Sequence, residues 1–300
     1  MNKQKLILKF FQKANQLKIS NRTYRQTVIF LFKWLLANDE IKTDITSQLL
    51  KLRSKKTARI ISHETATVAG IEEISYLLHH LTQLSFKPLL KDGNSVKNNQ
   101  VIAKVQGPVN EILTYERTII SFLQRMSGIA TQTKNFVGLI NSPSLQIAAT
   151  RKTPWASLDK KAVAVGGGLT HRLSLHDGIL VKDNHLKLTS IPQALKIILP
   201  QINHQLIEVE VKNQAEAFQA LNTFNQLNQD NYLAIMFDNF STPAIKKTIV
   251  QLNNQFVIYE ASGGINETNI LSFSKTGVDI ISLGALTHST RAVNLSLEIS

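Results

Sequence analysis

The order of apolar and polar positions divides the chain into two halves with different periodicities. In the first half, RTYRQTVIFLFKWLLAN (22–38) has helical spacing, whereas TARIIS (57–62) and QVIAKVQG (100–107) alternate as half-buried strands do. A helix is predicted at ISYLLHHLTQL (74–84), and residues 111–140 read as one or two long amphipathic helices. The first half therefore predicts a small α+β domain.

Short apolar runs alternate with helix-like segments in the second half. Each run is nearly all apolar, which is typical of parallel strands covered by helices. Asn213 with Glu216 three positions later, and Ser241 before Pro243, are helix start signals. The pattern predicts a parallel β/α barrel or an open doubly wound sheet. The runs are LQIAAT, GILVKD, LIEVEV, LAIMFDN, FVIYEASGG and VDIISLGA.

Charged residues and glycines stand where these apolar runs end. The carboxyl ends of parallel strands meet at one rim of a barrel, or at one edge of an open sheet. We therefore expect these residues to converge on a site. They are Arg151, Lys152, Lys182, Asp183, Asn184, His185, Glu208, Glu210, Asp238, Asn239, Ser262, Gly263, Gly264, Gly284 and Ala285.

The charges at this rim suggest a ligand. Glu210 and Asp238 follow adjacent predicted strands and suit a hard cation such as Mg²⁺. The glycine-containing ends at 262–264 and 284–285 can offer backbone N–H groups to a phosphate. Together these groups indicate a polyanionic small molecule, magnesium and a phosphate. The cationic group, which suits carboxylates or phosphates, comprises Arg151, Lys152, His171, Arg172 and Lys182.

Composition narrows the function classes. The chain has 300 residues and no cysteine, which excludes disulfides, a thiolate nucleophile and cysteine-bound metal centres. The spacing of VGGGLTHR (165–172) matches neither the P-loop nor the dinucleotide-binding pattern. The start of the chain lacks a signal-peptide pattern, and VIFLFKWLL (28–36) is too short to span a bilayer. We expect a cytoplasmic protein with no membrane partner.

Positive charge is concentrated near the start of the chain. The formal net charge is +13, and residues 1–60 contribute fourteen Lys/Arg against three Asp/Glu. A basic segment can bind nucleic acid or an anionic surface. The favoured interpretation is a solvated, lysine-rich face, because no aromatic residues alternate with arginine as in RNA-binding motifs. Nucleic-acid binding stays as the alternative.

The chain carries an ordered set of sequence motifs. They are ERTIISFLQRMSGIAT, ATRKT, KKAVAVGGGLTHRLSLHDGILVKDNHL, IEVEV, FDN, ASGGI and GVDIISLGALTHS, preceded by KTDITS and ARIISHETATVAG. This ordered set resembles the quinolinate phosphoribosyltransferase family. The similarity is dense from about residue 111 to 290 and thinner upstream, and residues 1–26 have no clear counterpart.

The resemblance implies an incomplete parallel β/α barrel (120–287) with an N-terminal α+β domain (1–119), onto which residues 288–300 pack back. It implies transfer of phosphoribosyl from phosphoribosyl pyrophosphate to quinolinate with decarboxylation, using Mg²⁺ in a homodimer with shared active sites. Catalytic roles would fall to Lys152, Lys182, Glu210 and Asp238.

The resemblance also implies which residues bind the two substrates. Arg151, Lys152, His171, Arg172 and Lys182 would hold the quinolinate carboxylates, with Arg117 reaching in from the partner subunit. Glu210 and Asp238 would serve Mg²⁺ and ribose, and the 5′-phosphate would bind Ser262, Gly263, Gly264, Gly284 and Ala285. The glycines at 166–168 would let the chain turn after a helix and deliver His171 and Arg172.

One segment departs from the family pattern. This chain reads TRKTPWASLDKKAV, which is two residues shorter than the usual TRKTxPGLRxLEKxAV and lacks its Pro-Gly and arginine. Trp155 occupies the shortened loop. A paralogous enzyme that acts on nicotinate or another base is therefore kept as a second reading.

Overall fold

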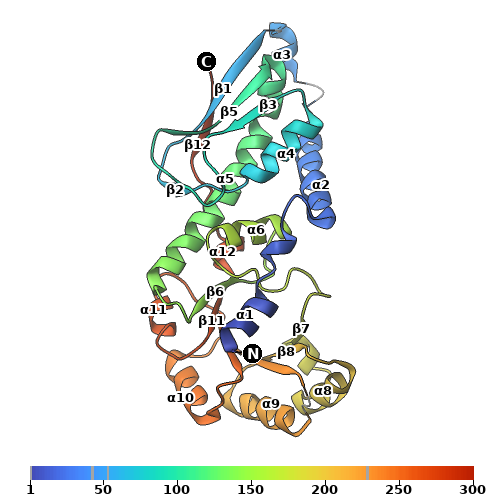
Figure 1. Cartoon of the computed structure of the whole chain (residues 1–300), viewed down its shortest axis with the longest axis vertical. Coiled ribbons are helices and arrows are strands. Elements are labelled where there is room, and N and C mark those ends of the chain that lie inside the picture. Colours follow the sequence, from blue (N-terminus) through green and yellow to red (C-terminus); the bar gives the residue numbers. More distant parts are fainter. Residues whose placement is uncertain (1, 42–43, 53, 228–229) are drawn as a thin grey trace. The chain divides into compact units, whose positions relative to one another are not determined.

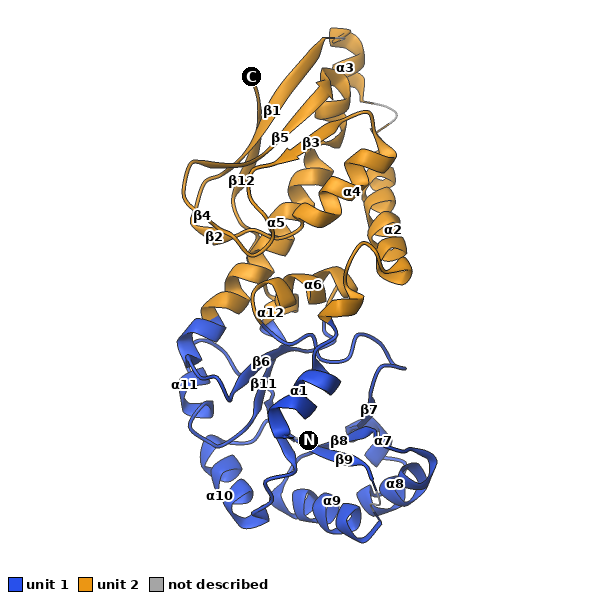
Figure 2. Cartoon of the chain, viewed as in Figure 1, with its two compact units in different colours: residues 1–13, 136–152, 168–285 blue, residues 14–135, 153–167, 286–300 orange. Residues whose placement is uncertain are grey.

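The computed structural model describes residues 2–41, 44–52, 54–227 and 230–300, and it forms two compact units (Figures 1 and 2). Unit 1 comprises residues 1–13, 136–152 and 168–285, and unit 2 comprises 14–135, 153–167 and 286–300. The first two residues of the KTDITS motif, 42 and 43, lie outside the described residues. The units interleave along the chain, so neither of them coincides with one continuous range.

Unit 2 contains an antiparallel sheet with helices. Its four-stranded sheet has the order β12-β1-β5-β3, and β2 pairs with β4. Since β12 pairs with β1, the end of the chain joins this sheet. The elements are η1 (Ala14–Gln16), α2 (Arg22–Asn38), α3 (Ile45–Leu50), β1 (Lys55–Ser62), β2 (Ala66–Thr67), α4 (Ile71–Leu81), β3 (Ser85–Pro88), β4 (Ser95–Val96), β5 (Gln100–Pro108), most of α5 (Val109–Ile140), α6 (Ser157–Val165), most of α12 (Ala285–His288) and β12 (Leu295–Ile299).

Unit 1 contains a six-stranded parallel sheet with the order β6-β11-β10-β9-β8-β7. Helix α9 packs on β8 and β9, with α8 and α10 beside it. The elements are α1 (Lys3–Phe11), β6 (Gln146–Ala149), β7 (Ile179–Val181), α7 (Asp183–Leu186), α8 (Ile191–Ile198), η3 (Leu199–Gln201), β8 (Leu206–Val211), α9 (Gln214–Leu227), β9 (Tyr232–Asp238), α10 (Thr242–Leu252), β10 (Ile258–Ser262), α11 (Ile270–Phe273) and β11 (Ile280–Leu283).

The strand order identifies this sheet as an incomplete barrel. The last strand, β11, pairs with the first, β6, as it does when a β/α sheet curls round on itself. Leu169 adds a parallel bridge to Ala148 on the free side of β6. Within the described residues no ladder joins the Leu169 segment to β7, so the barrel stays open there. The predicted fold class, an incomplete parallel β/α barrel with an antiparallel α+β part, is confirmed.

The inner face of the barrel changes from apolar to polar along the strands. At the amino ends, Ala148, Leu206, Ala234 and Ile258 form one core cluster with residues of α1. One and two pleats further along, the same face carries acidic and hydroxyl side chains, because residues two apart point to the same side of a strand. The barrel therefore has an apolar base and a polar rim.

Helix α1 packs against this apolar base of the barrel. Its apolar positions Leu6, Ile7 and Phe11 are buried against the barrel strands, and Asn2 caps its first turn. Residues 1–13 thus belong to the barrel unit, whereas the sequence analysis placed them in the N-terminal domain. The physical reason is that α1 presents a narrow apolar stripe that only a second apolar surface can bury.

No helix in the described part of the chain combines the length and the apolar character that crossing a bilayer requires.

Candidate active site

A cavity of about 610 Å³ opens at the carboxyl ends of the barrel strands. It collects side chains from six strands or the loops that follow them, and this convergence confirms the expected position of the rim. Its lining residues are Thr150, Arg151, Lys152, His171, Arg172, Leu180, Lys182, Asp183, Glu210, Met236, Asp238, Asn239, Glu260, Ser262 and Ser282.

Thirteen residues were expected to bind the substrates, and eight of them line this cavity, namely Arg151, Lys152, His171, Arg172, Lys182, Glu210, Asp238 and Ser262. Asp183 and Asn239, which were also expected at the rim, line it too. The other five of the thirteen are not among its lining. Gly263 and Gly264 follow β10, and Gly284 and Ala285 follow β11. Arg117 lies exposed on α5 in unit 2.

Four cationic side chains line the cavity, and we call them together its cationic side; they are Arg151, Lys152, Arg172 and Lys182. Arg172 is half-buried, and its pKa is lowered first by burial and then by the nearby Arg151 guanidinium. Two like charges that stay this close favour a ligand with negative charge between them. Lys182 follows β7 at the start of α7, where its backbone N–H faces Nδ1 of His185 at 3.2 Å. This side suits a dicarboxylate or a phosphate.

Two carboxylates also line the cavity, and we call them its acidic side. Glu210 is the penultimate residue of β8, and Asp238 ends the neighbouring β9. Burial raises the pKa of Glu210, and the negative charges of Asp238 and Asp183 raise it further. Carboxylates that repel one another in this way are stabilised by a cation, and their oxygens are the ligands that Mg²⁺ prefers.

The loop after β10 needs glycine for two reasons. Gly263 and Gly264 have φ values of 91° and 64°, in the region that favours glycine. At Gly263 an added Cβ would also collide with the Asn239 side chain and lie 2.9 Å from the Asn239 backbone nitrogen. Asn239 itself donates its N–H to the Ser262 carbonyl at 2.9 Å. The two loops therefore support each other at the edge of the cavity.

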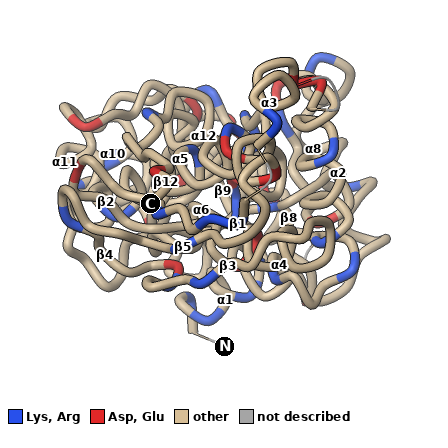
Figure 3. Tube along the Cα trace, turned by 90° about the horizontal axis from the view of Figure 1, so that it is seen from above, with Lys and Arg blue, Asp and Glu red and all other residues tan. Residues whose placement is uncertain are grey.

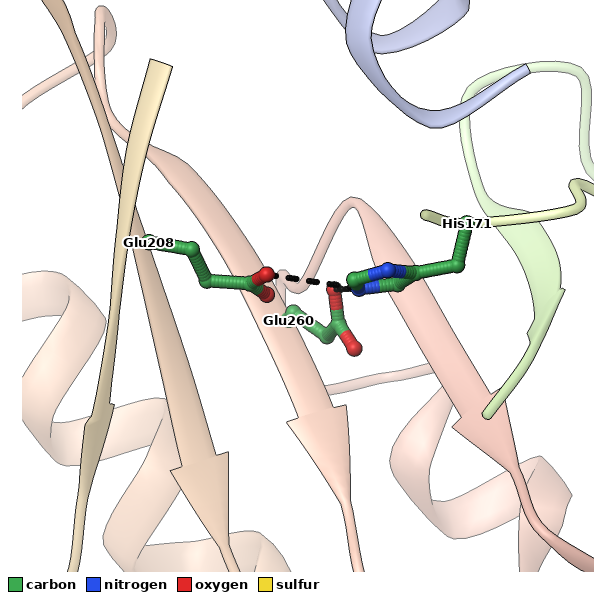
Figure 4. Close-up of side chains that lie close together, drawn as sticks. All are labelled: His171, Glu208 and Glu260. Atoms are coloured by element: carbon green, nitrogen blue, oxygen red, sulfur yellow. Dashed lines mark ion pairs between the residues drawn. The ribbon is translucent and has the colours of Figure 1, made fainter. Parts of the chain in front are cut away.

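Three buried ionisable side chains lie close together inside the barrel, and two of them, His171 and Glu260, line the cavity (Figure 4). His171 Nε2 lies 3.4 Å from Oε2 of Glu208 and 3.4 Å from Oε2 of Glu260. Burial lowers the pKa of His171 and the two carboxylates raise it, with a net rise, whereas the hydrogen bond that Nδ1 accepts from the Arg172 backbone N–H at 2.8 Å favours the neutral ring. Burial and the charge of Glu260 raise the pKa of Glu208 to about 7. We call these three residues the floor cluster.

The sequence analysis placed Glu208 among the residues expected at the rim without giving it a role, and it did not single out Glu260. The signal was present, because Glu208 precedes Glu210 by two residues and Glu260 precedes Ser262 by two. Within a strand this spacing places both members of each pair on the inner face. A glutamate in the middle of an apolar run could therefore have been recognised as a cavity residue.

The shortened loop around Trp155 is held inside unit 2. The buried Asp159 carboxylate accepts two hydrogen bonds from Arg125, at 2.8 and 2.7 Å, and one from the Trp155 backbone N–H at 3.3 Å. Thr153 donates a further hydrogen bond to Asp159. The Arg125 guanidinium also lies over the Trp155 ring, 5.3 Å from its centroid. The loop thus has a defined anchor despite its missing Pro-Gly.

The fold and the site together define the class of protein to which this chain belongs. A parallel barrel open on one side, with a cationic wall, an acidic pair and a glycine loop at its rim, is a phosphoribosyltransferase barrel of the kind that the motifs indicated. Residues 129–298 match the sequence profile of the quinolinate phosphoribosyl transferase C-terminal domain, and residues 44–127 match that of its N-terminal domain. The chain therefore belongs to the quinolinate phosphoribosyltransferase family.

Individual relatives agree with this assignment. The chain is 34% identical over 265 residues to a probable nicotinate-nucleotide pyrophosphorylase [carboxylating] of Bacillus subtilis, covering 86% of this chain and 88% of that protein. It is 36% identical over 268 residues to the Methanocaldococcus jannaschii protein of the same name, covering 85% and 91%. The solved nicotinate-nucleotide pyrophosphorylase of Francisella tularensis superposes with a TM-score of 0.82 at 34% identity, covering 92% and 96%.

Proposed function

We propose that this chain transfers the phosphoribosyl group of phosphoribosyl pyrophosphate to quinolinate with loss of CO₂, giving nicotinate mononucleotide and pyrophosphate. The observation that carries the proposal is that one cavity is lined both by cationic side chains and by the carboxylates of Glu210 and Asp238. Quinolinate is a dianion, and the ribose centre becomes cationic as pyrophosphate leaves. Each half of the reaction thus faces side chains of the opposite charge.

The cationic side would hold the base. Arg151, Lys152, Arg172 and Lys182 are proposed to bind the two carboxylates of quinolinate, with arginine supplying paired N–H donors. Held in this way, the ring nitrogen can attack C1 of the ribose while the bond from C1 to pyrophosphate breaks. The carboxylate at C2 then leaves as CO₂, its electron pair is stabilised by the cationic ring nitrogen, and C2 takes up a proton.

The acidic side would hold the sugar and the metal. Glu210 and Asp238 are proposed to bind Mg²⁺ and the ribose hydroxyls, and their negative charge tolerates the cationic character that develops at C1. When bound, the metal would offset the charge of the pyrophosphate group. The loops at 262–264 and 284–285 are proposed to bind the 5′-phosphate through their backbone N–H groups.

A homodimer is part of the proposal. Arg117 lies exposed on α5, and a long exposed cation on the α+β unit suits the carboxylate of a substrate bound to a second copy. We propose that each active site takes Arg117 from the partner subunit.

The alternative of nucleic-acid binding receives little support. The basic segment of residues 1–60 is divided between the two units. Two of its lysines form ion pairs within unit 1, Lys3 with Asp279 at 2.8 Å and Lys13 with Asp177 at 3.6 Å. Lysines and arginines are spread over many elements in Figure 3. Weak binding of mixed RNA that disappears near physiological salt is the expected behaviour.

Product analysis tests the proposed reaction. Purified protein is incubated with phosphoribosyl pyrophosphate, Mg²⁺ and quinolinate labelled in the C2 carboxylate. We expect nicotinate mononucleotide and labelled CO₂ in equal amounts. Nucleotide formation without CO₂, or no nucleotide at all, would refute the proposal.

A further inference from the structure

Both nitrogens of the His171 ring face groups of the protein. Its Nδ1 accepts a hydrogen bond from the backbone N–H of Arg172 at 2.8 Å. Its Nε2 faces the carboxylates of Glu208 and Glu260 at 3.4 Å each. Because Nδ1 accepts this hydrogen bond, the ring is in the neutral tautomer with its hydrogen on Nε2, the nitrogen that faces the two carboxylates. A quinolinate carboxylate approaching Nε2 would meet two like charges.

The same contacts argue against a metal ion in the floor cluster, although its ligand atoms all lie within 4.8 Å of one another. A metal on Nε2 would displace the hydrogen to Nδ1. There it would point at the Arg172 N–H, a second donor, and the 2.8 Å hydrogen bond would be lost. The cluster is therefore organised around a protonated Nε2 and an accepting Nδ1.

The backbone at His171 needs support. Its φ is 54°, a left-handed conformation that is unfavourable for a residue with a Cβ. Support comes from α1, because the His171 N–H donates to the Phe11 carbonyl at 2.8 Å and the ring meets the Phe11 ring edge-on at 4.9 Å. The ring lies against the carboxylates of Glu208 and Glu260 through Nε2, and its Nδ1 accepts the hydrogen bond from the Arg172 backbone N–H.

That next peptide belongs to Arg172, which lines the cavity. Beyond it the chain is fixed again, since Leu173 N–H donates to Asp177 at 2.8 Å and the Arg172 side chain reaches the Gly178 carbonyl at 3.4 Å. The direction of the guanidinium therefore depends on the peptide that joins residues 171 and 172.

We infer that His171 is a positioning residue: Glu208 and Glu260 clamp its ring, and the ring fixes the Arg172 backbone so that the guanidinium points into the cavity. This inference rests on the proposed function for its link to quinolinate. It refines the expectation that His171 binds the substrate directly, and it gives Glu208 and Glu260 a role that acts through another residue.

Amide hydrogen exchange tests the clamp without any assay of activity. In Glu260→Ala and in His171→Ala, the Arg172 amide should exchange at least about tenfold faster than in the unmodified protein, because its acceptor is released or removed. The His171 amide, which donates to Phe11, serves as the internal control and should change less. Unchanged exchange of the Arg172 amide in a folded Glu260→Ala protein would overturn the inference.

A double-mutant cycle tests the consequence for quinolinate. His171→Ala should lower kcat/KM for quinolinate about 30-fold when Arg172 is present but less than about threefold in the Arg172→Ala background, since coupled residues are non-additive. If His171→Ala lowered kcat/KM by the same factor with and without Arg172, His171 would act independently of Arg172, and the inference would be overturned.

Whether Glu260→Ala raises or lowers kcat/KM for quinolinate distinguishes a positioning role of Glu260 from a direct effect of its charge on the substrate. Removing a negative charge beside a dianion should improve quinolinate use, whereas a loosened Arg172 should impair it. We expect Glu260→Ala to lower kcat/KM for quinolinate about tenfold and Glu260→Gln, which keeps an acceptor, to restore most of it. Improved activity in Glu260→Ala would overturn the clamp. If the unmodified protein lacks turnover, the proposed function fails, and the exchange measurement still decides whether the clamp exists.

Discussion

At the residue scale, burial decides what a charged side chain can do. Glu73 on α4 is buried in unit 2 and accepts a hydrogen bond from the Tyr24 hydroxyl at 2.6 Å. Burial and the charge of Asp92 raise its pKa to about 7. Its neighbour Glu72 has a lowered pKa, because hydrogen bonds with Lys161 and Ile19 overcome the opposing effect of burial. The pKa values of these two adjacent glutamates are therefore shifted in opposite directions.

The raised pKa of Glu73 predicts a pH-dependent free energy of unfolding. The folded state binds the proton more tightly than the unfolded chain, so the stabilising contribution is complete below about pH 4.5 and is lost as pH rises through about 7. Glu73→Gln keeps an acceptor for Tyr24 without the charge. At pH 8 it should be more stable than the unmodified protein by roughly 1–3 kcal/mol, and at pH 4.5 the two should be equal.

Urea unfolding followed by tryptophan fluorescence measures this effect, because Trp34 and Trp155 both belong to unit 2. Glu72→Gln is the matched control, since its lowered pKa predicts a loss of stability at pH 8. A Glu73→Gln protein that is less stable at pH 8 would contradict the prediction.

The residue scale also shows where sequence reasoning reached its limit. Arg151, Lys182, Glu210 and Asp238 were found because each ends an apolar run, a position that can be seen in the sequence. Glu260 lies within such a run, and its proximity to His171 depends on the curvature of the sheet. Curvature results from the packing of distant strands, so no local pattern encodes it.

At the element scale, predictions were accurate where one periodicity dominated. The segment 22–38 is a helix with those bounds, because it is capped by Asn21 and has an unbroken apolar stripe. Residues 109–140 form one helix, whereas the pattern allowed one or two. The place of α1 was missed, because its partners Leu206 and Ile258 lie more than 190 residues away in the sequence.

The loop after β10 provides a prediction at this scale. Gly263→Ala forces the loop away from Asn239 and out of its left-handed conformation. If this loop binds the 5′-phosphate, KM for phosphoribosyl pyrophosphate should rise about tenfold or more, with a smaller change for quinolinate. The strain alone is on the order of 1–3 kcal/mol.

Gly138→Ala is the control for Gly263→Ala, since no atom lies within 4 Å of its added Cβ in α5 and alanine favours a helix. It should keep activity and be slightly more stable. Steady-state kinetics with each substrate varied in turn checks both variants. Equal effects of Gly263→Ala on both substrates would contradict a phosphate-binding role.

At the scale of the whole molecule, the proposed homodimer would build each active site from residues of two chains. Arg117→Ala and Lys182→Ala would remove different walls of the active site, so each homodimer should be nearly inactive. Mixing the two proteins should restore activity, because one site in each heterodimer has both residues intact. Subunit exchange is verified with differently tagged chains. Exchange without recovery of activity would contradict the shared site.

The order of the motifs along the sequence was sufficient to indicate the family. The preference for one base over another depends instead on the cationic side chains that line the cavity. A site with four cations for carboxylates leaves charges unpaired when the base has only one carboxylate. Sites built for a polar group disfavour an analogue without it by up to roughly 10⁴–10⁵-fold. Trp155, in the shortened loop, is the residue at which a different base preference would first be sought.

The most direct measurement compares kcat/KM for quinolinate with kcat/KM for nicotinate, at saturating phosphoribosyl pyrophosphate and Mg²⁺. The account predicts a preference for quinolinate of about 10⁴-fold or more. Comparable values for the two bases would contradict the assignment of the cationic side to a dicarboxylate.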